Sequence, residues 1–166
     1  FRECPEAVSN TLEIAERCTL DLTRDLDYSF PDYPAPDGYT PESYLEKLCY
    51  ESAVRRYGAI THAVRQRLDE EFRLVRRYKL AGFLLMYYEV IKLGREIMID
   101  QGLSDPSLTV EENPPGRGRG SSVALLIGYL IGLSHIDPLR YNLTLERFLP
   151  ADSMSSVPDI DLDFPR

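Results

Sequence analysis

An alternating acidic segment near the C-terminal end constrains this chain most strongly. Residues 158–164 are PDIDLDF, so Asp159, Asp161 and Asp163 alternate with large apolar side chains. In a β-strand every second side chain points to the same face, which would place the carboxylates on one surface and the apolar residues against a core. Like charges so close together repel one another unless a cation neutralises them. Two interpretations stay open: a strand that binds a hard divalent cation, or a solvated acidic edge strand that discourages aggregation.

The composition indicates a soluble globular chain. Its 166 residues, 43% hydrophobic and 28% charged, fit a single domain with a real core. The net charge of −8 argues against an autonomous nucleic-acid-binding domain, because such domains are usually basic. Cys4, Cys18 and Cys49 are widely spaced and form no CxxC pair, which favours reduced thiols and a cytoplasmic location. No signal segment is recognised, and the longest apolar run, residues 123–133, is too short to cross a bilayer.

Helical patterns fill most of the first hundred residues. Apolar spacing and capping residues predict helices over residues 5–18, over residues 41–57, and in a third segment that begins after Thr61. The segment 81–99 is apolar nearly all round, which predicts a helix that is buried on most sides. Residues 102–115 are polar and contain proline, so we expect a flexible surface loop or insertion there.

Basic side chains gather in two stretches of the chain. The first follows the second and third predicted helices, and we interpret it as a solvated face balanced by Asp69, Glu70 and Glu71. Phosphate or partner binding by this face is the alternative. The basic residues of the first stretch are Arg55, Arg56, Arg65, Arg67, Arg73, Arg76, Arg77 and Lys79. The second stretch is Arg117 and Arg119, within a glycine-rich loop.

This glycine-rich loop stands directly before the apolar run. Residues 116–122 are GRGRGSS, and residues 123–133 predict a buried helix that Ser121 or Ser122 would cap. Glycines let the backbone approach a ligand, and the free N–H groups of a helix N-terminus favour phosphate. The loop matches neither a Walker A motif nor a dinucleotide-binding fingerprint. Together with the acidic strand it favours nucleotidyl transfer, in which two metal ions clamp the attacking and leaving oxygens.

Four motifs occur in a fixed order along the chain. They are GRGS with its apolar run, HIDPL at residues 135–139, LERFL at residues 145–149, and PDIDLDF; LEIAERC at residues 12–18 and AGF at residues 81–83 extend the pattern. This set resembles the palm of the bacterial C-family DNA polymerases, the family of the DNA polymerase III alpha subunits. The resemblance implies an α+β, mainly helical fold, the N-terminal portion of a polymerase-β-like nucleotidyltransferase palm, with about five or six helices and a small sheet element.

The resemblance also implies a domain organisation. Residues 1–166 would form one partial palm, with a helical part over residues 1–101 and the loop over residues 102–115. Residues 116–166 would hold the Gly-Ser loop, the helix and the Asp-x-Asp strand. Because the family's other palm strands come later in sequence, we expect residues 159–164 to be poorly ordered or to pair with the connector after Cys18.

Individual roles follow from the same resemblance. Asp159 and Asp161 match the two catalytic, metal-binding aspartates, whereas Asp163 aligns with a third acid that the family does not count as a ligand and that spacing alone does not exclude. The matches to nucleotide-phosphate contacts are Arg119, Gly120, Ser121 and Arg147. The implied cofactor is Mg²⁺, two ions in the complete enzyme. The implied partners are primer-template DNA and dNTPs, with the sliding clamp and other replisome subunits bound through regions absent here, and no membrane.

Some positions depart from the family pattern. Residues 116–118 are Gly-Arg-Gly where the family has Gly-Pro-Gly, and larger residues at 123–125 replace small ones, which favours the error-prone branch. The family's third catalytic aspartate lies on a later strand, so we expect residues 1–166 alone not to polymerise DNA and to bind metal weakly or not at all. The alternatives are another nucleotidyltransferase of the polymerase β superfamily, or a non-catalytic helical module that binds DNA or a partner.

Overall fold

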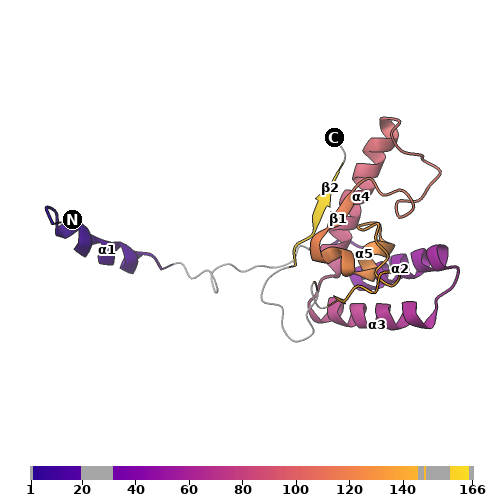
Figure 1. Cartoon of the computed structure of the whole chain (residues 1–166), viewed down its shortest axis with the longest axis horizontal. Coiled ribbons are helices and arrows are strands. Elements are labelled where there is room, and N and C mark those ends of the chain that lie inside the picture. Colours follow the sequence, from indigo (N-terminus) through magenta and orange to yellow (C-terminus); the bar gives the residue numbers. More distant parts are fainter. Residues whose placement is uncertain (1, 20–31, 146–147, 149–157, 165–166) are drawn as a thin grey trace.

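The computed structural model describes residues 2–19, 32–145, 148 and 158–164. Within them the chain forms five α-helices, one 3-10 helix and two short strands, which confirms the predicted mainly helical α+β class (Figure 1). In chain order the elements are α1 (Glu6–Arg17), α2 (Pro41–Tyr57), α3 (His62–Arg77), α4 (Ala81–Asp100), β1 (Arg117–Arg119), the 3-10 helix η1 (Gly120–Ala124), α5 (Leu126–Leu130) and β2 (Asp161–Asp163).

Local capping fixes where α2 and α3 begin and where α2 ends. The Thr40 side chain accepts the Ser43 N–H at 3.2 Å, and the Ser43 side chain accepts the Thr40 N–H at 2.9 Å. This capping box satisfies backbone donors at the start of the helix. Gly58 ends α2 at a left-handed φ of 74°, and the Thr61 side chain caps α3 by accepting the Val64 N–H at 3.3 Å. The predicted starts of both helices are therefore confirmed.

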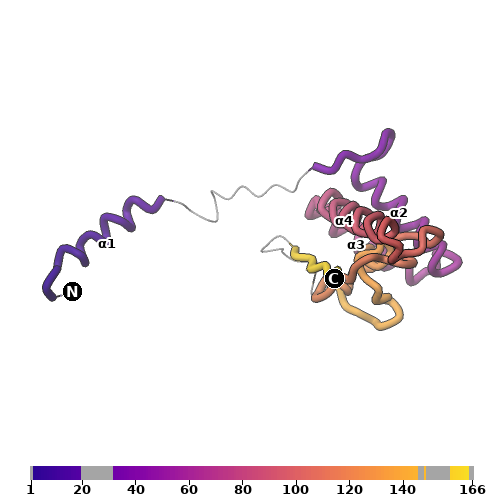
Figure 2. Tube along the Cα trace, turned by 90° about the horizontal axis from the view of Figure 1, so that it is seen from above, coloured from indigo at the N-terminus to yellow at the C-terminus, as the bar shows by residue number. Residues whose placement is uncertain are grey.

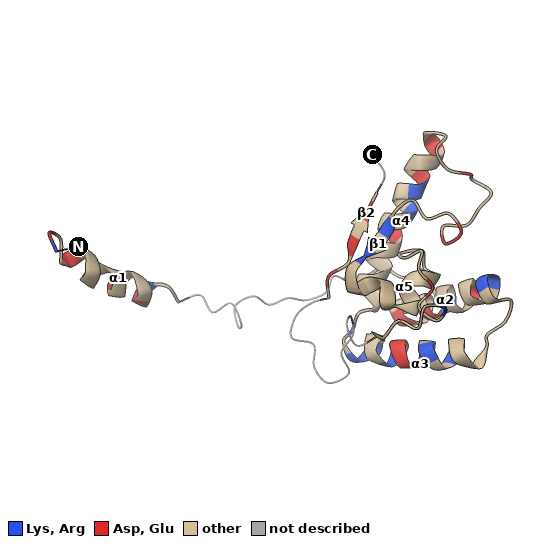
Figure 3. Ribbon diagram, in the orientation of Figure 1, with Lys and Arg blue, Asp and Glu red and all other residues tan. Residues whose placement is uncertain are grey.

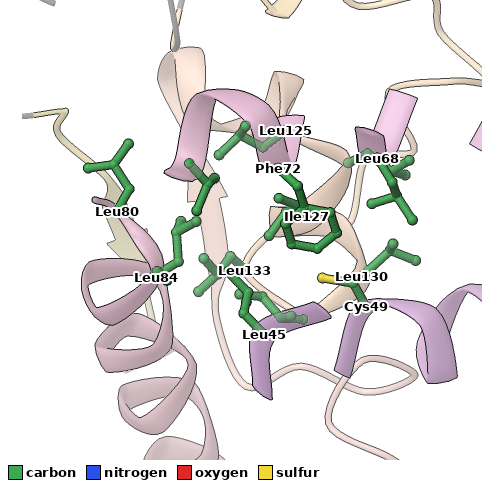
Figure 4. Packing of buried hydrophobic residues seen from close by; sticks show 14 of the residues in the cluster. Leu45, Cys49, Leu68, Phe72, Leu80, Leu84, Leu125, Ile127, Leu130 and Leu133 are labelled. Atoms are coloured by element: carbon green, nitrogen blue, oxygen red, sulfur yellow. The ribbon is translucent and has the colours of Figure 1, made fainter. Parts of the chain in front are cut away.

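The hydrophobic core lies among α2, α3, α5 and the start of α4. α5 packs against both α2 and α3, and α2 also contacts α4. Figure 4 shows apolar side chains from these elements converging on the segment that contains α5. Ten of the buried residues are Leu45, Cys49, Leu68, Phe72, Leu80, Leu84, Leu125, Ile127, Leu130 and Leu133. Burying one large apolar side chain stabilises a fold by roughly 1.5–3 kcal/mol, so this core is the main source of stability.

Helix α4 is less buried than its apolar sequence predicts. Its buried residues are Ala81, Leu84, Leu85 and Ile91. By contrast, Val90 and Leu93 are 47% and 57% exposed, and an open apolar groove runs along the second half of the helix to Phe164. The expectation of burial on most sides is wrong, because the described elements cover only one face of α4.

Helix α1 lies apart from the helical body. It spans Glu6–Arg17, close to the predicted range, and none of its residues is buried. Figures 1 and 2 show it well separated from α2, α3 and α4 in both views. Among the described residues, no helix is both long enough and apolar enough to cross a membrane.

The segment between α4 and β1 is held by arginines. The Arg95 guanidinium donates hydrogen bonds to the carbonyls of Asp105, at 3.0 Å, and Leu108. Glu111 is buried in this segment, where it accepts from Arg55 through its side chain and from Arg56 through its carbonyl. Two members of the first basic stretch therefore anchor this segment rather than form only a solvated face.

The small sheet contains β1 and β2 alone among the described residues. The strands are antiparallel, with Arg117 opposite Asp163, Gly118 opposite Leu162 and Arg119 opposite Asp161. We expected the acidic segment to be poorly ordered or to pair only with the connector after Cys18, and residues 20–31 of that connector lie outside the described residues. Within the described part of the chain, the glycine-rich loop is itself extended and supplies a partner strand, which the sequence did not predict.

Candidate functional site

The β1–β2 pair brings the glycine-rich loop and the acidic strand together. Side chains that lie directly opposite each other in an antiparallel pair project from the same face. The register therefore places Arg117, Arg119, Asp161 and Asp163 on one face of the sheet. Figure 3 shows the basic colour of β1 beside the acidic colour of β2. Two motifs that are remote in sequence thus form one charged surface.

Arg119 neutralises part of the acidic strand. Its Nε lies 3.7 Å from Asp161 Oδ2 and 3.3 Å from Asp163 Oδ2. The three side chains are 63%, 53% and 60% exposed, respectively, and exposed ion pairs of this kind contribute at most about 1 kcal/mol. Asp161 and Asp163 therefore both contact the Arg119 guanidinium, but these contacts are weak enough for another cation to replace it.

Asp159 lies just before β2, close to Tyr87 of α4. Ile160, the residue between Asp159 and Asp161, is buried, and its backbone lies near the Tyr87 side chain. Burial raises the pKa of Tyr87, and the negative charge of Asp159 adds to this effect. The sequence predicts only a helix buried on most sides here, and nothing in the spacing of its aromatic residues distinguishes Tyr87 from its neighbours.

Close backbone packing holds the loop at Gly116 and Gly118. The Gly118 N–H donates to the Leu133 carbonyl at 2.7 Å, and a Cβ added to Gly118 would lie 2.3 Å from that oxygen. The ring Nε2 of His135 donates to the Gly116 carbonyl at 2.8 Å. The chain after α5 therefore clamps β1 from the side opposite the charged face, where only glycine fits.

Replacing Gly118 with alanine is expected to destabilise the fold by about 1–3 kcal/mol, the usual cost of overpacking. The added methyl group cannot avoid the Leu133 carbonyl unless the backbone of β1 moves. Chemical denaturation monitored by circular dichroism measures the change. Gly128→Ala in α5 is the matched control, because a Cβ there makes only ordinary contacts of 3.4 Å or more. Equal stability of the two variants would contradict the proposed clamp.

The two serines of the loop have different environments. The predicted continuous helix over residues 123–133 is wrong, because η1 covers Gly120–Ala124 and α5 begins only at Leu126. Ser122 is buried, and its hydroxyl donates to the Arg119 carbonyl at 2.8 Å. Ser121 is half-buried, and its hydroxyl has no hydrogen-bond partner within the described part of the chain. Neither serine caps α5.

Gly120 forms an open turn beside Ser121. Its φ of 73° is left-handed, a conformation that favours glycine. A Cβ added there would meet no atom within 4 Å. A ligand can therefore approach the backbone at Gly120 closely, as the sequence motif predicts for a phosphate-binding loop.

A buried carboxylate from α3 caps α5. Glu71 is fully buried and accepts the N–H groups of Leu126 and Ile127, both at 2.8 Å. Arg67 donates to Glu71 at 2.7 Å and also to the Ala124 carbonyl at 2.7 Å. Burial raises the pKa of Glu71, and these hydrogen bonds oppose the rise.

This cap corrects two sequence expectations. Glu71 was expected to balance arginines on a solvated face, but it lies in the core. The N-terminus of the helix after the loop was expected to bind phosphate, but an internal carboxylate already takes those N–H groups. Phosphate binding in this region would therefore depend on Gly120, Ser121 and the Arg119 side chain.

Two sequence predictions about ligands have less structural support. Arg147, predicted to contact phosphate, lies outside the described residues. In the part of the chain that the structure describes, no three or more His, Cys, Asp or Glu side chains gather as a metal site would require. Asp159 and Asp161 still carry the hard oxygen donors that Mg²⁺ prefers, and Asp161 already contacts one cationic group, the Arg119 guanidinium.

Comparisons with known proteins define the class of the chain. The family described as the bacterial DNA polymerase III alpha NTPase domain matches residues 43–166, and the chain belongs to this family. The resemblance to these polymerases is therefore confirmed.

Curated relatives match almost the whole chain. An error-prone DNA polymerase of Symbiobacterium thermophilum is 37% identical over 99% of the chain and 14% of the relative. DNA polymerase III subunits alpha of Halalkalibacterium halodurans and Bacillus subtilis are 36% and 32% identical, each over 99% of the chain and 13% of the relative. The chain thus spans only 13 to 14% of the length of these relatives. Because both kinds of polymerase occur among them, the choice of the error-prone branch stays a prediction.

Proposed function

We propose that this chain is part of the catalytic palm of a DNA-directed DNA polymerase and carries one half of its nucleotidyl-transfer site. Membership of the polymerase III alpha family supports the proposal. The observation that carries it is the register of β1 and β2, which sets Arg119 directly opposite Asp161. A loop proposed to bind anions and a strand proposed to bind cations lie side by side, as transfer of a nucleotide from a triphosphate requires.

Each residue has a defined task in this proposal. Asp159 and Asp161 hold Mg²⁺, which when bound stabilises charge on the phosphates and activates the primer 3′-hydroxyl. Ser121, the backbone at Gly120 and the Arg119 guanidinium orient the triphosphate and neutralise its charge. Arg147 is proposed to add a further phosphate contact on the basis of the family motif alone.

The complete enzyme supplies the remaining parts. We propose that it acts in the bacterial cytoplasm on primer-template DNA and dNTPs. A sliding clamp and other replisome subunits would bind through regions outside residues 1–166. The third catalytic carboxylate also belongs to those regions, so residues 1–166 alone are proposed to be inactive.

The alternatives receive less support. A different nucleotidyltransferase of the polymerase β superfamily would share the loop and the acidic strand, but the family match argues against it. A non-catalytic module would use the basic face of α3. Arg67 and Arg76 form ion pairs with Glu71 and Glu46, which leaves less positive charge on this face for DNA.

Triphosphate binding tests the proposal. In a complete polymerase that contains this region, Ser121→Ala is expected to raise the Kd for a fluorescent dNTP analogue by about 10- to 100-fold. The reason is that a hydrogen bond to a charged group contributes roughly 1.5–3 kcal/mol. Titrations in Ca²⁺ keep the reaction from proceeding while the affinity is measured. Ser107→Ala is the control, since that hydroxyl bonds Asp105 within the 102–115 segment. Unchanged dNTP affinity in Ser121→Ala would refute the assigned role of the loop.

A further inference from the structure

We propose that Asp163 is a positioning residue, which holds Arg119 at the edge of the site while Asp161 binds a cation. The inference rests on the proposed function. It assigns a role to Asp163, the one acid of the PDIDLDF segment for which the family pattern supplies none. It starts from the ion-pair distances, because Arg119 Nε is nearer to Asp163, at 3.3 Å, than to Asp161, at 3.7 Å.

The register makes this preference informative. Asp161 lies directly opposite Arg119, whereas Asp163 is its diagonal neighbour two residues further along β2. Directly opposite side chains in a sheet are normally the closer pair. The Arg119 side chain therefore leans along the sheet toward Asp163. Arg117, which is directly opposite Asp163, forms no ion pair within the described residues.

The contact of Arg119 with the two carboxylates uses only its Nε, which leaves its other guanidinium nitrogens for a ligand. Both carboxylates contact Nε of Arg119. An arginine has five N–H donors in a planar fork, so its two terminal Nη groups can still bind a phosphate while Nε stays with Asp163. Asp163 can thus orient Arg119 without competing for the nucleotide.

A divalent cation can replace Arg119 at the Asp161 carboxylate. A divalent cation interacts with Asp161 more strongly than a single exposed guanidinium does, so it displaces Arg119 from this carboxylate. Asp163 then keeps Arg119 beside the site instead of releasing it into solvent. Arg119 would neutralise Asp161 before the cation binds and contact the triphosphate afterwards.

A double-mutant cycle on the complete polymerase tests the inference. The variants are Asp163→Asn, Arg119→Gln and their combination, and the readouts are the Kd of a dNTP analogue in Ca²⁺ and the Kd of Mn²⁺ without nucleotide. Asp163→Asn is expected to weaken dNTP binding about 2- to 5-fold, the range of an exposed ion pair. In the Arg119→Gln background it should have no further effect. Mn²⁺ affinity should change less than about twofold in Asp163→Asn.

Two controls sharpen the result. Asp163→Glu keeps the charge and should retain wild-type dNTP affinity. Arg117→Gln removes a charge from the same face without breaking an ion pair and should have little effect on dNTP affinity.

If Asp163→Asn weakens Mn²⁺ binding as strongly as Asp161→Asn, Asp163 is a metal ligand and the inference is wrong. The inference is also wrong if the double variant raises the dNTP Kd by the product of the separate effects of Asp163→Asn and Arg119→Gln. If Arg119→Gln weakens dNTP binding but Asp163→Asn does not, the inference fails while the proposed function stands. If Arg119→Gln and Ser121→Ala are both without effect, the two fail together.

Discussion

In a complete polymerase that contains this region, Asp161→Asn is expected to lower the rate of nucleotide incorporation by about a thousandfold or more. A catalytic metal ion contributes several kcal/mol to transition-state stabilisation, and each 1.4 kcal/mol corresponds to roughly a tenfold change in rate. The amide keeps the size of the side chain but loses the charge that holds the cation. Single-nucleotide primer extension under rapid-mixing conditions measures the effect.

The other acid of β2 provides the matched comparison. Asp163→Asn removes the same charge from the same face, two residues away, and should lower incorporation by less than about tenfold. Both side chains are more than half exposed, so neither substitution should alter folding. Affinity for primer-template DNA should remain close to that of the wild-type enzyme in both variants. Near-normal incorporation by Asp161→Asn would exclude the proposed catalytic role of the acidic strand.

Replacing Glu71 with alanine is expected to destabilise the chain by about 3–5 kcal/mol, because it leaves one partner of a buried ion pair alone. Arg67 would lose its carboxylate, and the N–H groups of Leu126 and Ile127 would lose their acceptor in the core. The free energy of unfolding in urea measures the change. Because a domain is typically stable by only 5–15 kcal/mol, this single substitution could leave the chain partly unfolded.

The neighbouring residue supplies a sharp control for this prediction. Glu70 belongs to the same helix and has the same side chain, but it is exposed. Glu70→Ala should change stability by less than about 0.5 kcal/mol, as is usual for surface substitutions. Similar urea midpoints for the Glu70 and Glu71 variants would mean that the buried cap contributes little to the fold.

Features set by neighbouring residues could be predicted from the sequence. The starts of α2 and α3 follow from Thr40 and Thr61, whose side chains bond N–H groups three residues away. The C-terminal end of α2 follows from Gly58, which adopts the left-handed conformation that glycine favours. These signals are local, so no knowledge of the tertiary fold is needed to interpret them.

Features that depend on distant partners could not be predicted in this way. Glu71 looked like one more charge on a basic helix, because its acceptor role depends on N–H groups 55 and 56 residues further along the chain. The exposure of Val90 and Leu93 depends on which elements cover α4, which an all-round apolar pattern does not reveal. The proximity of Tyr87 to Asp159 likewise depends on a segment that is remote in sequence.

The candidate site was predicted in its parts but not in its assembly. The glycine-rich loop and the acidic segment were both interpreted as functional from their residue types, and their roles stay a prediction. Their direct pairing as β1 and β2 was not foreseen, because strand register is a property of the folded chain. Nor did the sequence reveal that Arg119 would contact both Asp161 and Asp163.

The pairing of β1 with β2 has a consequence for the order in which the chain folds. The two strands close a loop of about forty residues, and the entropy lost in closing a loop must be offset by contacts that form only afterwards. Helices α2 and α3 are adjacent in sequence and can form and pack early. The charged face would therefore assemble late, on a helical body that has already folded. A chain with normal helical content could still lack the arrangement of Arg119 and Asp161 on which the proposed chemistry depends.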